Sequence, residues 1–147
     1  MKKAIIVAAG KKDYEKLIEV WEGSVRATHH FLSEQDIVGY RWLILYEYFD
    51  QVKLYNIKVE GEIMGFIGIN GKSIQMLFIH PDARGKGLGK RLIDFAKQEH
   101  DVNIVDVNEQ NKQAVGFYQK LGFVTIERSE VDGAGKPFPV LSMELKA

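Results

Sequence analysis

Apolar residues recur along the chain with two different periods, which separate predicted helices from predicted strands. Spacings of three and four residues predict amphipathic helices from Tyr14 to Val25, with Asp13 as N-cap, and from Ser33 to about Phe49. Short β-rich runs predict strands at residues 4–8, 52–59, 63–69 and 74–79. Turn sequences at 60–62 and at Asn70-Gly71 make the last three of these strands consecutive antiparallel hairpins.

The second half of the chain alternates helices and strands. One helix is predicted from Leu88 to near His100. A second follows residues 108–111, has the apolar face Ala114, Phe117, Tyr118 and Leu121, and ends at Gly122. Strands are predicted at 102–107, 124–131 and 140–145. Because a helix separates strands 74–79 and 102–107, these two run parallel. The predicted fold is α+β over a single domain, residues 1–147. Its seven-stranded sheet is mostly antiparallel, has one central parallel pair and is flanked by about four helices.

Composition narrows the function mainly by exclusion. Twenty basic residues balance twenty acidic ones, so the chain has no bulk attraction for nucleic acid or an anionic membrane. No apolar stretch approaches the roughly 20 residues that span a bilayer. The lack of cysteine excludes thiolate chemistry and is typical of a cytoplasmic protein. No spacing of His, Asp and Glu is typical of a metal site, so we expect no metal.

A glycine-rich loop between a predicted strand and a predicted helix is the strongest candidate binding site. Residues 84–89 read Arg-Gly-Lys-Gly-Leu-Gly and follow the strand that Pro81 ends. The first N–H groups of the next helix have no intrahelical partner, and the helix dipole adds partial positive charge there. Glycines admit a ligand close to the backbone, and Arg84 and Lys86 add full charges. This arrangement predicts a phosphate-binding loop.

Three glycine patterns compete for this loop. The nucleotide P-loop fails because Arg84 stands at its first glycine and Arg91 at its Ser or Thr. The dinucleotide pattern fails because Lys90 replaces its third glycine. The remaining pattern, Arg84-x-x-Gly87-x-Gly89, resembles the pyrophosphate-binding signature of the GNAT family of N-acetyltransferases, which bind acetyl-CoA.

Residues 111–123 provide a second resemblance to the same family. They read Asn-Lys-Gln-Ala-Val-Gly-Phe-Tyr-Gln-Lys-Leu-Gly-Phe and begin 22 residues after Gly89, which leaves room for one helix and one strand. The resemblance covers essentially the whole chain and is weakest over residues 1–50. The segments 28–32 and 135–139 resemble a small bacterial branch of the family.

The resemblance implies an acetyl-CoA site. It implies that the strand before the glycine loop bulges and splays from its parallel neighbour, and that its backbone N–H groups bind the cofactor. The cofactor-binding residues are then Leu77, Phe78, Ile79, Arg84, Gly85, Lys86, Gly87, Leu88, Gly89, Asn111 and Lys120. Core packing for 77–79, an N-cap for Asn111 and a solvated lysine for Lys120 are the structural alternatives.

Acetyl transfer to an amine needs help for the leaving thiolate and an acceptor for the amine proton. The resemblance implies the Tyr118 hydroxyl for the first task, and Asp106 is our candidate base, directly or through water. The structural alternatives are a buried tyrosine for Tyr118 and a buried hydrogen-bonded carboxylate for Asp106. We expect Trp21, His29, Phe31 and Tyr40, with the loop around 136–138, to form the acceptor pocket.

The predicted function is an acetyl-CoA-dependent N-acetyltransferase that acts by direct attack of a primary amine of a small molecule or peptide on the thioester. The alternative is an acyl-CoA-binding sensor of the same fold without turnover. The sequence does not identify the acceptor or the oligomeric state.

Overall fold

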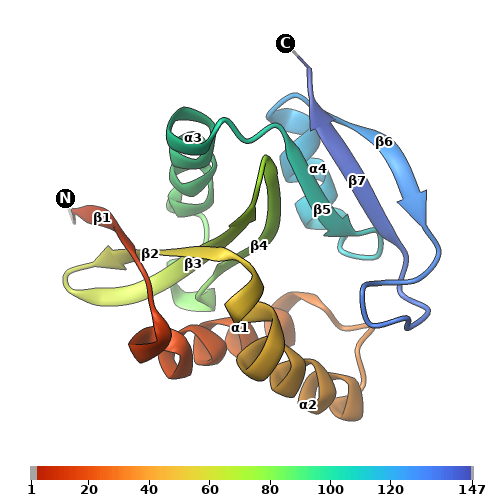
Figure 1. The fold of residues 1–147 in the computed structure, drawn as a ribbon, viewed down its shortest axis with the longest axis horizontal. Helices are drawn as coiled ribbons and strands as arrows, with labels where there is room; N and C mark the ends of the chain where they lie inside the picture. The colour runs from red at the N-terminus through yellow and green to blue at the C-terminus, as the bar shows by residue number, and fades with distance from the viewer. Residues whose placement is uncertain (1–2, 147) are drawn as a thin grey trace.

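A seven-stranded sheet forms the centre of the computed structural model, which describes residues 3–146 (Figure 1). The strands lie in the order β1-β2-β3-β4-β5-β7-β6, and every neighbouring pair is antiparallel except β4 and β5. The bounds are β1 Ala4–Ala8, β2 Lys53–Val59, β3 Glu62–Asn70, β4 Ser73–Ile79, β5 Ile104–Asn108, β6 Phe123–Ser129 and β7 Val140–Leu145. The predicted fold class is therefore confirmed, including its single parallel pair.

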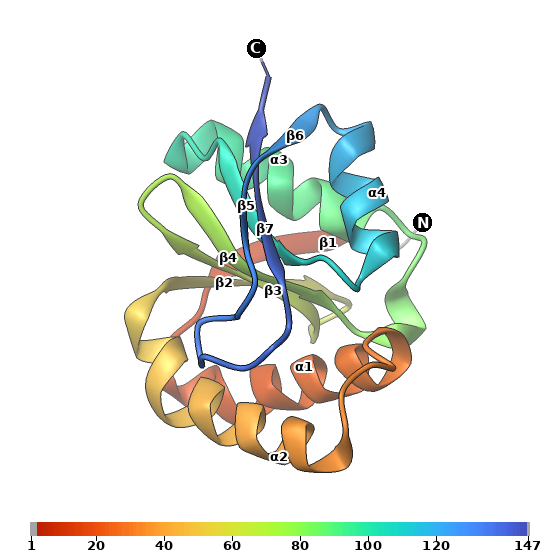
Figure 2. The same ribbon diagram turned by 90° about the vertical axis from the view of Figure 1, so that its right-hand side faces the viewer.

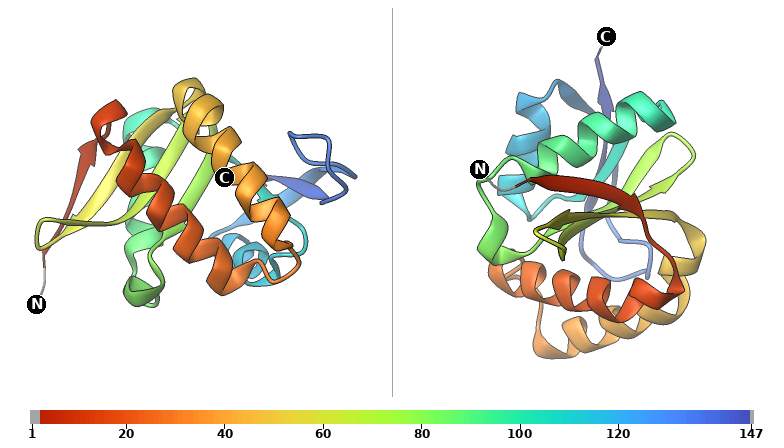
Figure 3. Two further views of the ribbon diagram at one scale, coloured as in Figure 1. Left: turned by 90° about the horizontal axis from the view of Figure 1, so that it is seen from below. Right: turned by 90° about the vertical axis from the view of Figure 1, so that its left-hand side faces the viewer.

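Two helices cover each face of the sheet, as Figures 2 and 3 show. On one face α1 and α2 pack over a core that contains Trp21, Phe49 and Phe66. On the other face α3 and α4 pack over a core that contains Leu92 and Phe123. The helix bounds are α1 Tyr14–Thr28, α2 Glu34–Leu43, α3 Leu88–His100 and α4 Lys112–Lys120. Among residues 3–146, none of the helices combines the length and apolar character needed to cross a bilayer.

Local sequence signals position most helix ends, with two corrections. Ser33 and Asp36 form the capping box of α2, whereas the Asp13 side chain accepts from Gly10 and makes no cap bond to α1. The prediction of one helix to Phe49 is wrong in detail, because the α-helix ends at Leu43 and a π-helical turn, Ile44–Tyr48, follows.

The turn between β3 and β4 differs by one residue from its prediction. Asn70 still pairs with Ser73, so the two turn residues are Gly71 and Lys72. Gly71 has φ +61° and supplies the left-handed conformation that this tight turn requires.

The parallel pair opens soon after it forms. β4 and β5 pair only at Ser73 with Ile104 and at Ile74 with Val105. A bulge then follows in β4, because Gly68 and Ile69 of β3 pair with Met76 and Ile74 and leave Gln75 as an extra residue. β5 continues beside β7 as far as Asn108. The bulge and the divergence predicted for this strand are both present (Figure 1).

Candidate active site

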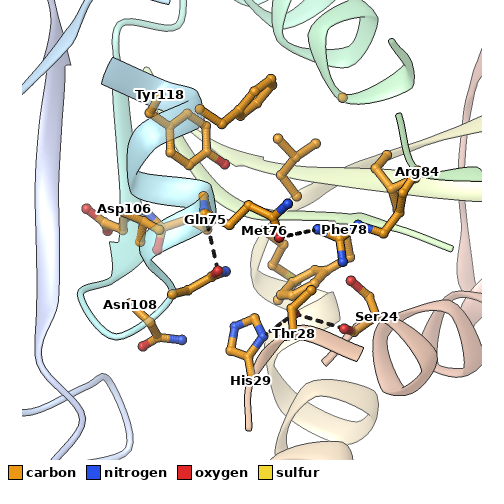
Figure 4. A pocket seen from close by; sticks show the side chains of 18 of the residues that line it. Ser24, Thr28, His29, Gln75, Met76, Phe78, Arg84, Asp106, Asn108 and Tyr118 are labelled. Atoms are coloured by element: carbon orange, nitrogen blue, oxygen red, sulfur yellow. Dashed lines mark hydrogen bonds between the residues drawn. The ribbon is translucent and has the colours of Figure 1, made fainter. Parts of the chain in front are cut away.

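A cavity of about 920 Å³ lies where β4 and β5 diverge. Its walls come from these two strands, the glycine-rich loop, the first turn of α3, the helix α4 and the end of α1 (Figure 4). Of the residues predicted from the sequence it brings together Leu77, Phe78, Ile79, Arg84, Gly85, Gly87, Leu88, Gly89, Asp106, Asn111, Tyr118, Lys120 and His29. Lys86 does not line it.

The hydrogen-bond pattern of β4 leaves alternate N–H groups facing this cavity. The backbone N–H of His80, just after β4, donates to the carbonyl of Met64 in β3 at 2.7 Å. Two residues earlier, Phe78 pairs with Phe66 of β3 in the same register. Because bonded and non-bonded positions alternate in an antiparallel pair, the N–H groups of Leu77 and Ile79 point away from β3. They therefore face the side from which β5 has diverged.

The glycine-rich loop forms the other end of the cavity. Gly87 is the N-cap of α3 and has φ +79°, and Gly85 has φ +76°, a left-handed conformation that L side chains rarely adopt. A Cβ at either glycine would meet nothing within 4 Å, so the loop backbone borders open space. The first α-helical hydrogen bond of α3 runs from Arg91 N–H to the Gly87 carbonyl, so the N–H groups of residues 88–90 lack that partner.

The second helix N-terminus lies close to the first. Arg84 donates to the Gln113 side chain at 2.8 Å, and a Cβ at Gly89 would lie 3.5 Å from the Phe117 ring. Asn111 caps α4 by accepting from Ala114 N–H at 3.4 Å, so its predicted structural role is confirmed. Free N–H groups, two open glycines and the nearby cations Arg84 and Lys112 are the donor set that a diphosphate requires, so these residues fit coenzyme A.

Tyr118 brings a hydroxyl into the cavity from α4. Its ring is buried against Phe117 and Phe123, and its hydroxyl points toward the β4 side in Figure 4. Burial raises the pKa of Tyr118, and no hydrogen bond from another residue in the part of the chain described contributes to this shift. The hydroxyl is thus a protonated donor at neutral pH.

Asp106 faces the same cavity from β5. Its Oδ1 accepts from the Ser142 hydroxyl at 2.7 Å. Its Oδ2 accepts from the amide of Gln75 at 3.2 Å, and Figure 4 labels these two residues. Each carboxylate oxygen keeps a further lone pair. Asp106 is therefore a hydrogen-bonded carboxylate, as in the structural alternative, and it also lines the cavity. Its role as the base stays a prediction.

A second cavity, of about 200 Å³, adjoins the first and extends toward α2. His29, Gln75 and Phe78 line both cavities. The predicted acceptor residues Trp21 and Tyr40 line the smaller cavity, which is otherwise mostly apolar. Phe31 lines neither cavity and instead packs against the rings of His29 and Phe138.

The loop between β6 and β7, residues 130–139, closes over this smaller cavity. The Tyr40 hydroxyl donates to Asp132, and burial is the first cause, with Asp132 the second, of the raised pKa of Tyr40. Lys136 pairs with Asp36 at 3.3 Å and lies over the Tyr40 ring. Figure 2 shows this loop reaching toward α2.

Sequence reasoning did not identify several of the polar residues that line the site. Gln75, Tyr48 and Asn108 line both cavities, and Asp132 lines the smaller one. Gln75 had a signal, since it is the one polar side chain in the run Ile74–Ile79. Asp132 had none, because its place depends on a loop that returns to α2.

Comparisons with known proteins agree with this geometry. Residues 24–146 match the model of the acetyltransferase (GNAT) domain. A peptidyl-lysine N-acetyltransferase, YjaB of Salmonella typhimurium, is 42% identical over 130 residues, which are 88% of this chain and 89% of that protein.

Two solved structures have the same fold. The solution structure of apo-form YjaB from Escherichia coli has a TM-score of 0.87 and 38% identity, and covers 97% of both chains. The PaiA N-acetyltransferase of Thermoplasma acidophilum, solved in complex with coenzyme A, has a TM-score of 0.77 at 21% identity, and covers 97% of this chain and 99% of that chain. At that identity the second likeness shows the fold alone.

The predicted family and enzyme class are confirmed, and relatives that are named for acetyl transfer do not favour the alternative of a sensor without turnover. The chain belongs to the GNAT acetyltransferase family and is an N-acetyltransferase that uses acetyl-CoA as its acetyl donor.

Proposed function

We propose that the acceptor is the side-chain amine of a peptidyl lysine. The observation that carries this proposal is the small, mostly apolar cavity that shares Gln75 of the β4 bulge with the larger one. The name of the Salmonella typhimurium relative supports the same acceptor class. The cytoplasmic location stays a prediction.

The chemistry of the smaller cavity suits a lysine side chain. A lysine has an apolar four-carbon stem and a polar end, and Trp21, Val25 and Phe138 offer apolar surface to such a stem. Asp132 is the one carboxylate among the residues that line this cavity, and its charge favours the approach of a cationic side chain.

The cofactor-binding roles follow from the larger cavity. When bound, acetyl-CoA supplies the thioester that the amine attacks directly. We assign its diphosphate to the N–H groups around Gly87 and to Arg84, with Lys112 beside them, and we keep Asn111 and Lys120 as further contacts. Lys86 is a solvated charge at the rim.

The catalytic roles follow from the free hydrogen-bonding groups. The N–H groups of Leu77 and Ile79 stabilise negative charge on the carbonyl oxygen. The Tyr118 hydroxyl donates to the leaving sulfur as its charge grows. Asp106 accepts the proton that the amine loses, directly or through one water, since its carboxylate keeps free lone pairs.

A thiol-release assay tests the acceptor. Acetyl-CoA is incubated with a lysine-containing peptide, the same peptide with lysine replaced by arginine, and the same peptide already acetylated on Nε. We expect thiol release with the first peptide alone, and mass spectrometry should locate the acetyl group on lysine Nε. Equal release with the arginine peptide, or release with free amines alone, would reject the peptidyl-lysine acceptor.

Asp106→Asn tests the base. The variant keeps an oxygen for Ser142 but cannot take a proton, so kcat should fall about a hundredfold while KM for acetyl-CoA stays unchanged. Ser142→Ala removes one hydrogen bond to Asp106 without removing the carboxylate and serves as the milder control. A wild-type kcat in Asp106→Asn would remove Asp106 from the mechanism.

A further inference from the structure

His29 stands where the two cavities meet, and hydrogen bonds hold it on one side. The residue is 6% exposed and lines both cavities. The backbone N–H of His29 donates to the Val25 carbonyl at the end of α1. The Thr28 hydroxyl oxygen lies 2.7 Å from ring atom Nδ1 of His29 (Figure 4). The backbone and the neighbouring hydroxyl therefore fix the position of the ring.

The Thr28 hydroxyl decides which ring nitrogen carries the proton. A hydroxyl has one hydrogen to donate, and that of Thr28 goes to the Ser24 carbonyl at 2.9 Å. The contact with Nδ1 is then a hydrogen bond only if Nδ1–H donates to the Thr28 oxygen. A neutral imidazole carries a single N–H, so the other nitrogen, Nε2, is an acceptor with a free lone pair.

The surroundings keep the ring neutral and leave Nε2 open to the cavity. Burial first, and then the charges of His30 and Arg84, lower the pKa of His29 to about 4. Nε2 has no hydrogen-bond partner among residues 3–146, yet it is not a fully enclosed atom, since the one enclosed side-chain atom without a partner there is Asn56 Oδ1. An unpaired acceptor thus faces the junction of the cavities.

We propose that Nε2 of His29 positions the incoming amine by accepting a hydrogen bond from one of its N–H groups. The inference rests on the proposed function, because it needs an amine that arrives through the smaller cavity. No proton is transferred to His29. A neutral acceptor fixes the orientation of the amine and leaves the nitrogen lone pair free, while Asp106 takes the proton.

Nitrogen-15 NMR of the imidazole tests the proposed tautomer of His29 without any turnover. The wild type near pH 7 should show a protonated Nδ1 and an unprotonated Nε2. Thr28→Ser keeps the hydroxyl and should keep this tautomer, whereas Thr28→Val loses the acceptor for Nδ1–H and should give a mixture. A protonated Nε2 in the wild type, or the same spectrum in Thr28→Val, would overturn the inference.

Steady-state kinetics with a lysine peptide test the role in binding. His29→Leu should raise KM for the peptide about tenfold, the usual effect of one lost hydrogen bond, and leave KM for acetyl-CoA unchanged. His29→Gln can place an amide oxygen near the position of Nε2 and should recover most of the loss. A wild-type peptide KM in His29→Leu, or no recovery in His29→Gln, would contradict the proposal.

The two proposals fail in different ways. If lysine peptides are not acceptors, the wild type releases no thiol with them, and the proposed function fails whatever the state of His29. If the wild type turns over and its peptide KM does not respond to His29→Leu, the inference alone fails.

Discussion

Tyr118 offers the sharpest test at the scale of a single residue, because its ring and its hydroxyl do different things. The ring packs in the core, while no hydrogen bond to the hydroxyl contributes to its raised pKa. Tyr118→Phe should therefore change the free energy of unfolding by no more than about 0.5 kcal/mol. It should lower kcat for thiol release about a hundredfold and leave the affinity for acetyl-CoA nearly unchanged.

A second tyrosine provides the matched control. Tyr14 donates to Asp50 at 2.8 Å, and it lines neither cavity. Tyr14→Phe removes a hydroxyl of the same kind and should leave kcat at the wild-type value. If both variants have wild-type kcat in the thiol-release assay, the Tyr118 hydroxyl has no role in turnover.

The sequence could indicate Tyr118 and Asn111 because both belong to a contiguous motif. The sequence could not indicate the long-range hydrogen bonds that position other residues of the site. Asp106 is held by Gln75, which is 31 residues earlier, and by Ser142, which is 36 residues later. Tyr40 and Asp132 are 92 residues apart. Such pairs depend on how loops return, which no local spacing encodes.

At the scale of elements, the junction of the glycine-rich loop with α3 carries the cofactor site. Gly87→Glu places a carboxylate beside the free N–H groups of α3, where it competes with the diphosphate. We expect acetyl-CoA binding to be lost in isothermal calorimetry. The φ of +79° adds a strain cost of about 1 kcal/mol to the free energy of folding.

Gly87→Asn separates charge from strain. Asparagine tolerates the left-handed conformation better than most residues and carries no charge. It should therefore keep measurable affinity for acetyl-CoA. Wild-type affinity in Gly87→Glu would show that the diphosphate binds elsewhere.

Periodicity predicts elements well where one side of an element is buried. The bounds of β1, α3 and β7 agree with the sequence because each has clear apolar spacing and a clear stop. The π-helical turn after Leu43 was not predictable, because its apolar residues continue the same spacing. The splay of β4 from β5 came only from the family resemblance.

For the whole molecule, His29 makes stability depend on pH. The unfolded chain binds a proton with the ordinary pKa of 6.5, but the folded chain does so only near a pKa of about 4. The stability is therefore fully present above pH 6.5 and is lost as the pH falls from 6.5 toward 4. Between pH 7 and pH 5 the free energy of unfolding should fall by about 2 kcal/mol from this group.

Urea unfolding of three proteins checks this dependence. His29→Gln lacks the titrating group and should lose about 2 kcal/mol less than the wild type between pH 7 and pH 5. His30→Gln removes an exposed neighbour whose charge is a smaller cause than burial of the lowered pKa of His29, so it should keep most of the wild-type pH dependence. Equal pH dependence in the wild type and His29→Gln would mean that burial of His29 does not control acid stability.

The alternating N–H directions of β4 have a consequence for hydrogen exchange. His80 N–H is bonded to the Met64 carbonyl, and Phe78 occupies the equivalent position two residues earlier, whereas Leu77 and Ile79 N–H face the cavity. Backbone amide deuteration should therefore proceed at an odd–even rhythm within one strand, fast at 77 and 79 and slow at 78 and 80. Saturation with acetyl-CoA should slow exchange at 77 and 79 and so reduce the difference in exchange rate between these amides and those of 78 and 80.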